Sequence, residues 1–301
     1  MMVYKSSRRV DFGDVFGALF SALQWRLLLL WVLILLLPVA VAALPLLQAL
    51  GALLDHSTHA RAWAQQFDMI MFGDVTQALG SQHAMFHGAL VASLLLALLL
   101  LPWINGMVLA SGRAGRALGF GGLLQGGLAE YGRMFRLLLW SLLPYVAAGF
   151  LVQLGLDKAD DASDAAVLES RAMAAQHTAW WCAGVVIVIA QAWVESARAA
   201  FVADTSLRSA SIAMLRGLLQ LLRRPFSTLF AYLLVSLVGF ALAMALGYVR
   251  VHTLAVGTQG LMFGFALSAL VMVVLGWTRI ARLFALAEVA RSLGGSRRSS
   301  F

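Results

Sequence analysis

The chain has 301 residues, of which 61% are hydrophobic and only 12% are charged, and its mean hydropathy is +0.86. A soluble domain is typically about 45–50% apolar and about 25% charged, so this composition excludes an ordinary soluble enzyme and indicates an integral membrane protein. The formal net charge is +8, but basic residues gather in the cytoplasmic loops of membrane proteins, so we expect no nucleic-acid partner. The single cysteine, Cys182, excludes a disulfide within the chain.

The chain begins with a basic N-terminal segment, residues 1–10, which we expect in the cytoplasm. In the segment 11–24 that follows, apolar residues recur at helical spacing. A basic amphipathic helix beside a membrane span usually lies in the membrane interface, and we interpret this segment in that way. Two similar segments precede later apolar runs: 122–134 and 209–222.

Six apolar runs are long enough to cross a bilayer, because about 20 helical residues span a hydrocarbon core of about 30 Å. They lie at 27–50, 89–111, 136–156, 178–197, 226–248 and 259–278. No run carries a charge in its middle, and backbone groups in lipid must be hydrogen-bonded within their own segment, so we expect α-helices. The predicted fold class is all-α, a polytopic membrane protein with one membrane domain over 11–290 and a disordered basic tail over 291–301.

The first apolar run has a second interpretation. Arg26 followed by apolar residues 27–37 and by Ala40-Val41-Ala42 resembles a signal peptide with its cleavage site. The 26 residues before the run are too many for the usual basic region of a signal peptide, and similar runs return later in the chain. We therefore expect this segment to be retained as a membrane span.

Charge is distributed unequally between the two sides of the six runs. Eighteen of the 22 basic residues lie on the side that carries both termini. Four lie on the other side: Arg61, Lys158, Arg171 and Arg250. By the positive-inside rule, this distribution predicts that both termini are cytoplasmic. Only two of the basic residues are lysines, which together with the abundance of alanine and leucine suggests a GC-rich bacterial genome and hence a bacterial inner membrane.

The runs form three similar pairs. Each odd-numbered run begins with an arginine: Arg26, Arg136 and Arg224. Each even-numbered run ends with an arginine, at spacings of 85 and 84 residues: Arg113, Arg198 and Arg282. The pattern predicts three helical-hairpin repeats, each preceded by an interfacial helix and related by an axis along the membrane normal. The alternative is that leucine-rich runs resemble one another by composition alone.

Over residues 10–290 this layout resembles that of broad six-span membrane-domain families, such as the membrane domain found beside glycerophosphodiester phosphodiesterases. The resemblance rests on the organisation of the runs and not on a diagnostic motif. The soluble catalytic domain of that family has no counterpart in this sequence. The resemblance therefore implies a membrane domain, and it implies neither phosphodiesterase activity nor any functional residue.

One candidate site combines an acid with the repeated arginines. Glu195 is the only acid at the inner end of a run, and Arg198 follows it by three residues. Arg113 and Arg282 occupy the equivalent positions in the other pairs, so a threefold arrangement would bring all four side chains together near the cytoplasmic leaflet. Two interpretations are open, a gate or anionic-headgroup site and an ion-paired anchor that sets helix depth. We favour the anchor, because an arginine at a helix end can reach the interface alone.

A second candidate site lies on the opposite side, where all six histidines are found. The spacings His56-x-x-His59 and His83-x-x-x-His87 each place two imidazoles on one helix face. With nearby aspartates they would suit zinc or copper, although the glutamate of a zincin motif is absent. We favour a solvated outer loop without a metal or other cofactor. The acidic segment 157–169 lacks the register of a calcium-binding EF-hand, and we expect a solvated loop there too.

The runs hold few groups that support chemistry. They contain no histidine or aspartate, which argues against an intramembrane protease and a proton-coupled carrier. Their polar residues are Gln48, Ser93, Asn105, Ser141, Gln153, Gln191, Ser236 and Ser268. We therefore expect a non-enzymatic scaffold or accessory subunit of a membrane complex, with membrane proteins and anionic lipid headgroups as partners. The alternative is a transporter or lipid-handling protein with a cavity between the repeats.

Overall fold

A computed structural model describes residues 12–55, 57–58, 69–80, 83–114, 117–166, 168–253 and 257–295. Across these residues every regular element is an α-helix, and six of the helices are long and apolar enough to cross a membrane. The expectation of an all-α, multi-pass membrane protein is confirmed in this form.

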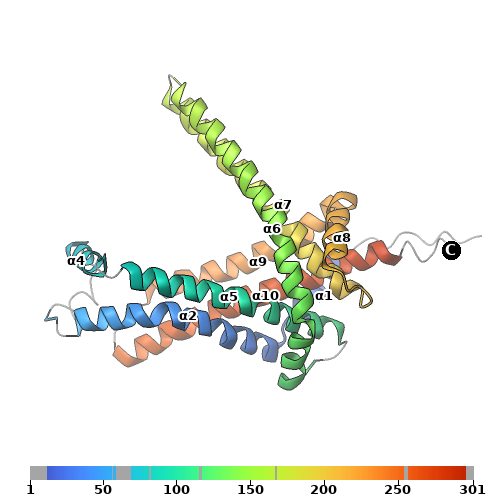
Figure 1. The fold of residues 1–301 in the computed structure, drawn as a ribbon, viewed down its shortest axis with the longest axis horizontal. Helices are drawn as coiled ribbons and strands as arrows, with labels where there is room; N and C mark the ends of the chain where they lie inside the picture. The colour runs from blue at the N-terminus through green and yellow to red at the C-terminus, as the bar shows by residue number, and fades with distance from the viewer. Residues whose placement is uncertain are drawn as a thin grey trace, which may run out of the picture.

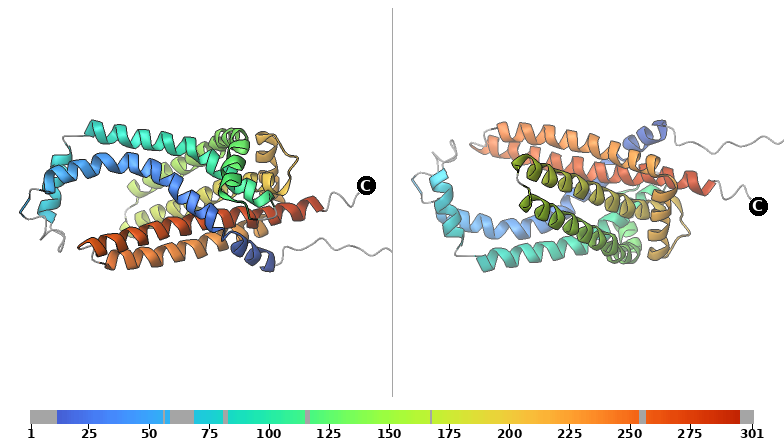
Figure 2. Two further views of the ribbon diagram at one scale, coloured as in Figure 1. Left: turned by 90° about the horizontal axis from the view of Figure 1, so that it is seen from below. Right: turned by 90° about the horizontal axis from the view of Figure 1, so that it is seen from above.

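Each predicted run lies within one long helix. The six long helices are α2 (Trp25–Leu54), α5 (His83–Arg113), α6 (Phe120–Asp164), α7 (Glu169–Ala203), α9 (Pro225–His252) and α10 (Gly257–Gly295). Shorter helices are α1 (Phe12–Ser21), α4 (Met69–Gly80) and α8 (Ala210–Arg223). Pro38, Pro45, Pro102 and Pro144 lie inside α2, α5 and α6, which continue through them. In Figure 2, α2 bends along its length, as expected for a helix that holds two prolines.

Consecutive long helices pack as pairs, α2 with α5, α6 with α7, and α9 with α10. The segment that precedes the first apolar run of each pair packs against the second helix of another pair. The helix α1 packs on α10, the first part of α6 packs on α5, and α8 packs on α7. In Figure 1, α1, α8 and the end of α10 lie at one end of the molecule, whereas α4 lies at the opposite end.

The same kind of contact holds all three of these segments in place. A tryptophan indole in the long helix donates a hydrogen bond to a backbone carbonyl of the segment: Trp277 to Leu19 at 3.0 Å, Trp193 to Met214 at 2.9 Å and Trp103 to Leu124 at 3.3 Å. Glycines allow the close approach in two of them. A Cβ atom on Gly217 of α8 would lie 2.6 Å from the Ala197 nitrogen, and one on Gly127 would lie 2.6 Å from the Trp103 ring.

Three boundaries differ from the prediction. The segment 122–134 is the first part of α6 and not a separate helix, because no residue there stops a helix as Pro225 stops α8. The predicted loop 157–169 is mostly wrong, since α6 continues to Asp164 and α7 begins at Glu169. The helix α10 continues to Gly295, so the predicted tail begins inside it, and residues 296–301 lie outside the described residues.

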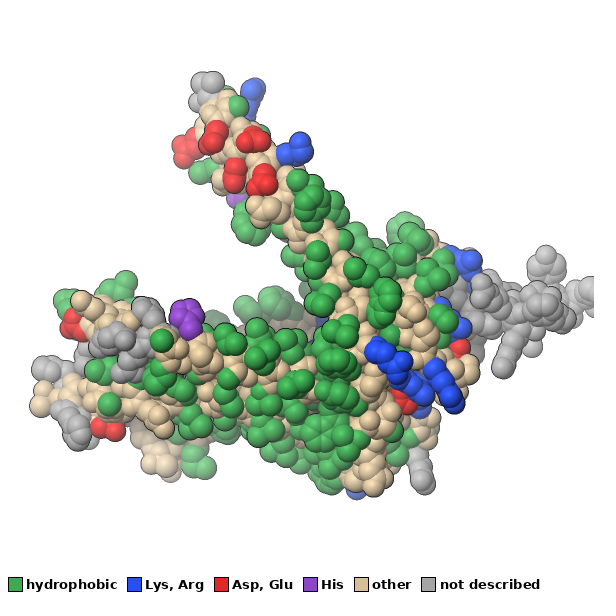
Figure 3. Space-filling model, viewed as in Figure 1, with side chains coloured by type: hydrophobic (Ala, Val, Ile, Leu, Met, Phe, Trp, Pro, Cys, Tyr) green, Lys and Arg blue, Asp and Glu red, His purple; other side chains and the backbone are tan. Residues whose placement is uncertain are grey.

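The buried core is concentrated at the end of the molecule that carries α1 and α8. Its largest fully buried side chains include Phe201, Leu27, Ile104, Met107, Ile280 and Leu286. Toward the opposite end the helices expose large apolar side chains, such as Leu94, Phe150, Trp181 and Phe265. The hairpin of α6 and α7 leaves the other long helices there and stands apart from them, with an apolar surface over much of its length (Figures 1 and 3). The helices are therefore packed closely at one end and separate at the other.

Candidate functional site

Three charged side chains meet where α7 packs against α10, namely Glu195, Arg198 and Arg282, and Arg279 lies one helix turn before Arg282 on the same face of α10. We call these four residues the arginine cluster. Within each helix the two members are three residues apart, so they lie on the same helix face. The local fold thus brings two pairs of charges together from the packed ends of two long helices.

Glu195 is the centre of the cluster. Its Oε1 lies 3.3 Å from Nη1 of Arg198 and 3.7 Å from Nη2 of Arg282. The glutamate side chain is only 3% exposed, whereas the side chains of Arg198 and Arg282 are 11% and 20% exposed. The carboxylate is therefore enclosed, and the two guanidinium groups reach the surface of the packed helices.

Arg279 is the third arginine of the cluster, and it interacts electrostatically with Glu195 and with both other arginines. Its guanidinium carbon lies 5.6 Å from the centroid of the Trp31 ring in α2, which is a cation–π distance. The buried Nε atoms of Arg279 and Arg282 have no hydrogen-bond partner among the described residues. A buried donor without an acceptor is costly, so these two atoms reduce the stability of the helix packing at the site.

Neutral polar groups from α9 border one side of the cluster. Nη1 of Arg282 donates to Oγ of Ser236 at 3.2 Å and to the hydroxyl of Tyr232 at 3.4 Å. The same guanidinium lies 5.1 Å from the Tyr232 ring centroid. On the side of α6, the Tyr145 hydroxyl interacts electrostatically with the cluster and donates to Oε1 of Gln191 at 2.7 Å. Five long helices thus contribute to the site.

The cluster carries an excess of positive charge. Arginine is always protonated in proteins, so three guanidinium groups face one carboxylate and leave a charge of +2. Uncompensated charge in a partly buried site is unfavourable. An arrangement of this kind can bind an anion, and guanidinium groups suit carboxylate and phosphate oxygens.

Sequence reasoning identified three members of the cluster and missed the fourth. Glu195, Arg198 and Arg282 meet in the structure, whereas the sequence pattern places Arg279 only among the basic residues of the inner side. The signal that could have identified it is its spacing of three residues from Arg282, the same spacing that joins Glu195 to Arg198.

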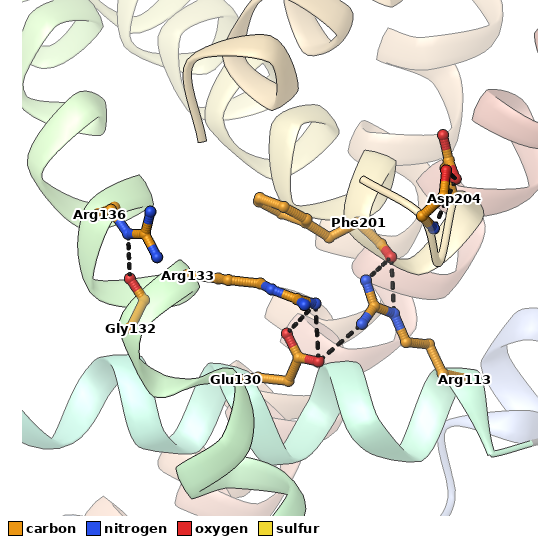
Figure 4. Close-up of polar contacts among 8 residues, drawn as sticks. Arg113, Glu130, Gly132, Arg133, Arg136, Phe201 and Asp204 are labelled. Carbon is orange, nitrogen blue, oxygen red and sulfur yellow. Dashed lines mark hydrogen bonds and ion pairs between the residues drawn. The ribbon is translucent and has the colours of Figure 1, made fainter. Parts of the chain in front are cut away.

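The structure does not bring Arg113 to the cluster. Its Nε and Nη2 donate to the carbonyl of Phe201, at 2.9 and 2.6 Å, and its Nη1 lies 2.8 Å from Oε1 of Glu130 (Figure 4). Phe201 lies in the last turn of α7, where carbonyls lack partners within the helix. Arg113 therefore caps α7, and Arg133 completes the network by pairing with Glu130 at 2.9 Å.

Asp204 follows the last residue of α7 and lies three residues after Phe201, whose carbonyl belongs to this network. It accepts hydrogen bonds from the amide and hydroxyl of Ser206, at 2.9 and 2.6 Å, and from Arg216 of α8 at 2.6 Å. These bonds, first the one from the Ser206 hydroxyl and then the one from Arg216, lower the pKa of Asp204 from 3.8 to about 2. Asp204 thereby fixes the connection between α7 and α8.

The predicted metal site falls largely outside the described residues. His56 and His59 are not described, and only the backbone of His83 is, at the start of α5. His87 lies in the second turn of the same helix. Among the described residues no three metal-binding side chains form a group, and the histidine site stays a prediction.

The polar residues of the spans are distributed over several places. Gln191 and Ser236 border the arginine cluster. Ser93 of α5 donates instead to the Pro38 carbonyl of α2 at 2.7 Å, and Ser141 donates to a carbonyl of its own helix. These four side chains do not line one common lumen.

Compared with protein-family models, curated proteins and solved structures, the chain shows no match. The resemblance in layout to the membrane domain of glycerophosphodiester phosphodiesterases stays a prediction.

Proposed function

We propose that this six-span protein is non-enzymatic and that it binds an anionic lipid headgroup at the arginine cluster. The observation that carries the proposal is the excess of two positive charges around Glu195, on a cluster in which the Arg198 and Arg282 side chains are partly exposed. An anionic headgroup would supply the missing negative charge and would accept hydrogen bonds from the guanidinium groups that reach the surface. The protein would then act in lipid binding or lipid handling.

We propose that the cluster faces the cytoplasmic leaflet, with both termini in the cytoplasm and the chain in a bacterial inner membrane. The charge pattern of the sequence supports this orientation. In Figure 3, basic side chains gather at the end that carries α8, and acidic side chains are prominent at the tip of the α6–α7 hairpin. The cluster lies toward the basic end of the long helices, where anionic lipids are most abundant in such an orientation.

We also propose that the three helix pairs are repeats around one axis. The support is cyclic packing, since each amphipathic segment contacts the second helix of a different pair and α1 closes the ring on α10. The three indole-to-carbonyl hydrogen bonds support the same arrangement. The cluster is not threefold, because Arg113 caps α7 instead of joining Arg198 and Arg282.

Native mass spectrometry of the purified full chain tests the proposed function. The probes are phosphatidylglycerol and phosphatidylcholine with the same acyl chains. We expect the anionic lipid to bind preferentially, and we expect Arg282→Gln to weaken its binding at least about tenfold, which corresponds to about 1.4 kcal/mol. Arg291→Gln is the matched control, because Arg291 is exposed and its one ion pair within the described part of the chain is with Glu288 in its own helix turn. Equal binding of both lipids would contradict the proposal.

A second candidate function is that of a scaffold or accessory subunit in a membrane complex. The hairpin of α6 and α7 favours it, because its separated part presents apolar faces that no other described helix covers (Figures 1 and 3). Extraction in a mild detergent would then yield a stable complex with other membrane proteins. A chain that remains monomeric and without partners would count against this function.

A further inference from the structure

The arginine cluster also indicates which anionic lipid it binds. Resting on the proposed function, we infer that its ligand is a lipid with a terminal phosphomonoester, and not a phosphodiester lipid with a single charge. The inference follows from three features of the site: its charge, the donors that remain free, and its surroundings.

Charge is the first feature. The cluster holds three arginines and one glutamate, so it lacks two negative charges. A phosphomonoester carries about −1.5 to −2 near neutral pH, whereas a phosphodiester carries one charge. The phosphomonoester therefore neutralises the partly buried site, and the phosphodiester leaves one positive charge uncompensated. The uncompensated charge is the less favourable state in a partly buried site.

The donors of the cluster are the second feature. Arg198 uses Nη1 on Glu195, and Arg282 uses Nη2 on Glu195 and Nη1 on the hydroxyls of α9. Among the described residues the two Nη atoms of Arg279 and Nη2 of Arg198 have no hydrogen-bond partner, so these donors remain for a ligand, whereas the Nε atoms of Arg279 and Arg282 are enclosed by protein. A guanidinium offers five donors in a planar fork, and a terminal phosphate offers three oxygens that can each accept several hydrogen bonds. A phosphodiester has only two such oxygens, so it satisfies fewer donors.

The surroundings of the cluster are the third feature, and they favour a lipid over free phosphate. Trp31 and Tyr232 place aromatic rings beside two of the guanidinium groups. Away from the packed end, the long helices expose large apolar side chains, including Leu37 of α2, Ile187 of α7 and Leu275 of α10. The hairpin of α6 and α7 separates from the other helices in the same direction, which leaves space for acyl chains (Figure 3).

Competition between headgroups tests this inference on the unmodified chain. Native mass spectrometry of the full chain in a neutral detergent would compare phosphatidic acid, phosphatidylglycerol and phosphatidylcholine with identical acyl chains, and inorganic phosphate. We expect phosphatidic acid to bind at least about tenfold more tightly than phosphatidylglycerol, with phosphatidylcholine and inorganic phosphate weaker than both. Equal affinity for the two anionic lipids would overturn the inference and leave the proposed function standing.

The remaining outcomes are equally decisive. If neither anionic lipid binds better than phosphatidylcholine, the proposed function fails as well. If inorganic phosphate binds as tightly as phosphatidic acid, the headgroup chemistry is right but the ligand is not a lipid, and the inference is overturned.

Two variants of Arg279 separate charge from folding. Arg279→Gln reduces the charge of the cluster from +2 to +1, so we expect the preference for phosphatidic acid over phosphatidylglycerol to fall to about twofold or less. Arg279→Lys retains the charge and should retain most of the preference, although it loses the planar fork. Arg291→Gln again serves as the control. An unchanged preference in folded Arg279→Gln would contradict the role assigned to the cluster charge.

Discussion

Arg113 shows how one side chain can join three helices. It lies in the last turn of α5, pairs with Glu130 of α6, and donates two hydrogen bonds to the Phe201 carbonyl near the end of α7. The carbonyl also lies at the negative end of the α7 dipole, where a cation is favourable. This role could not be predicted from the sequence, because the acceptor is a backbone atom 88 residues away.

We predict that Arg113→Ala destabilises the folded protein by about 1–3 kcal/mol, because it leaves the buried Phe201 carbonyl without its donor and leaves Glu130 with Arg133 alone. The measurement is the unfolding free energy in detergent, with Arg291→Ala as the control. The control removes an exposed pair within one helix turn and should change stability by less than about 1 kcal/mol. Equal effects of the two substitutions would show that the cap contributes nothing specific.

The lowered pKa of Asp204 predicts that the stability of the connection between α7 and α8 depends on pH. Its pKa is lowered to about 2 in the folded chain by Ser206 and Arg216, while an unfolded aspartate titrates near 3.8. The folded state therefore binds its proton less readily, so the stabilisation is present above about pH 4 and is lost as the pH falls toward 2. The protection factors of α8 amides, which correct for the pH dependence of intrinsic exchange, should fall over this range. In Asp204→Asn the protection factors should already be lower at neutral pH, and their change between pH 4 and 2 should be smaller.

The contrast between Arg113 and the arginine cluster shows what residue spacing can reveal. Glu195 and Arg198 are neighbours on one helix face by spacing alone, and the repeated position of Arg282 brought it into the same prediction. Arg279 lies three residues before Arg282 and was identifiable by the same spacing, whereas the acceptor of Arg113 was not. Contacts between distant helices depend on packing, and a single sequence does not specify them.

At the scale of elements, the long helices were predictable and their ends were not. Apolar runs identify spans because lipid imposes a minimum length and excludes charge. The same rule concerns only the apolar region. It therefore does not predict how far helices such as α6 and α10 continue beyond that region with polar residues. The helix α4 (Met69–Gly80) was not predicted, since its segment has no strong period and lies between spans.

We predict that Gly217→Ala weakens the packing of α8 on α7. The added Cβ would lie 2.6 Å from the Ala197 nitrogen and 2.9 Å from the Trp193 carbonyl oxygen, and backbone atoms cannot move aside cheaply. Overpacking of this kind costs about 1–3 kcal/mol, measured as unfolding free energy.

Gly149→Ala is the matched control, because a Cβ on Gly149 of α6 meets no atom within 4 Å. Alanine is the better helix former by about 1 kcal/mol in water, so this substitution should be neutral or stabilising. If Gly217→Ala were equally well tolerated, the close contact of α8 with α7 would be contradicted.

At the scale of the whole molecule, the charged networks lie at the same end as the closely packed core. The arginine cluster, the Arg113 network and the three indole contacts all lie toward the closely packed end, and the apolar helices separate toward the other. A rigid end that fixes donors and an open end that exposes apolar faces suit an amphiphilic ligand, whose headgroup and chains need different surroundings.

The proposed orientation can be tested on one helix. Ser170 and Thr205 are exposed and lie in the first turn of α7 and two residues beyond its end, and the 35 residues of α7 span about 50 Å, more than a hydrocarbon core. In a Cys182→Ala background, we predict that a membrane-impermeant maleimide labels Ser170→Cys in spheroplasts and labels Thr205→Cys only after the membrane is permeabilised. The background variant without a cysteine should remain unlabelled. The reverse pattern would invert the orientation and place the arginine cluster in the outer leaflet, and labelling of both positions from one side would remove α7 as a membrane span.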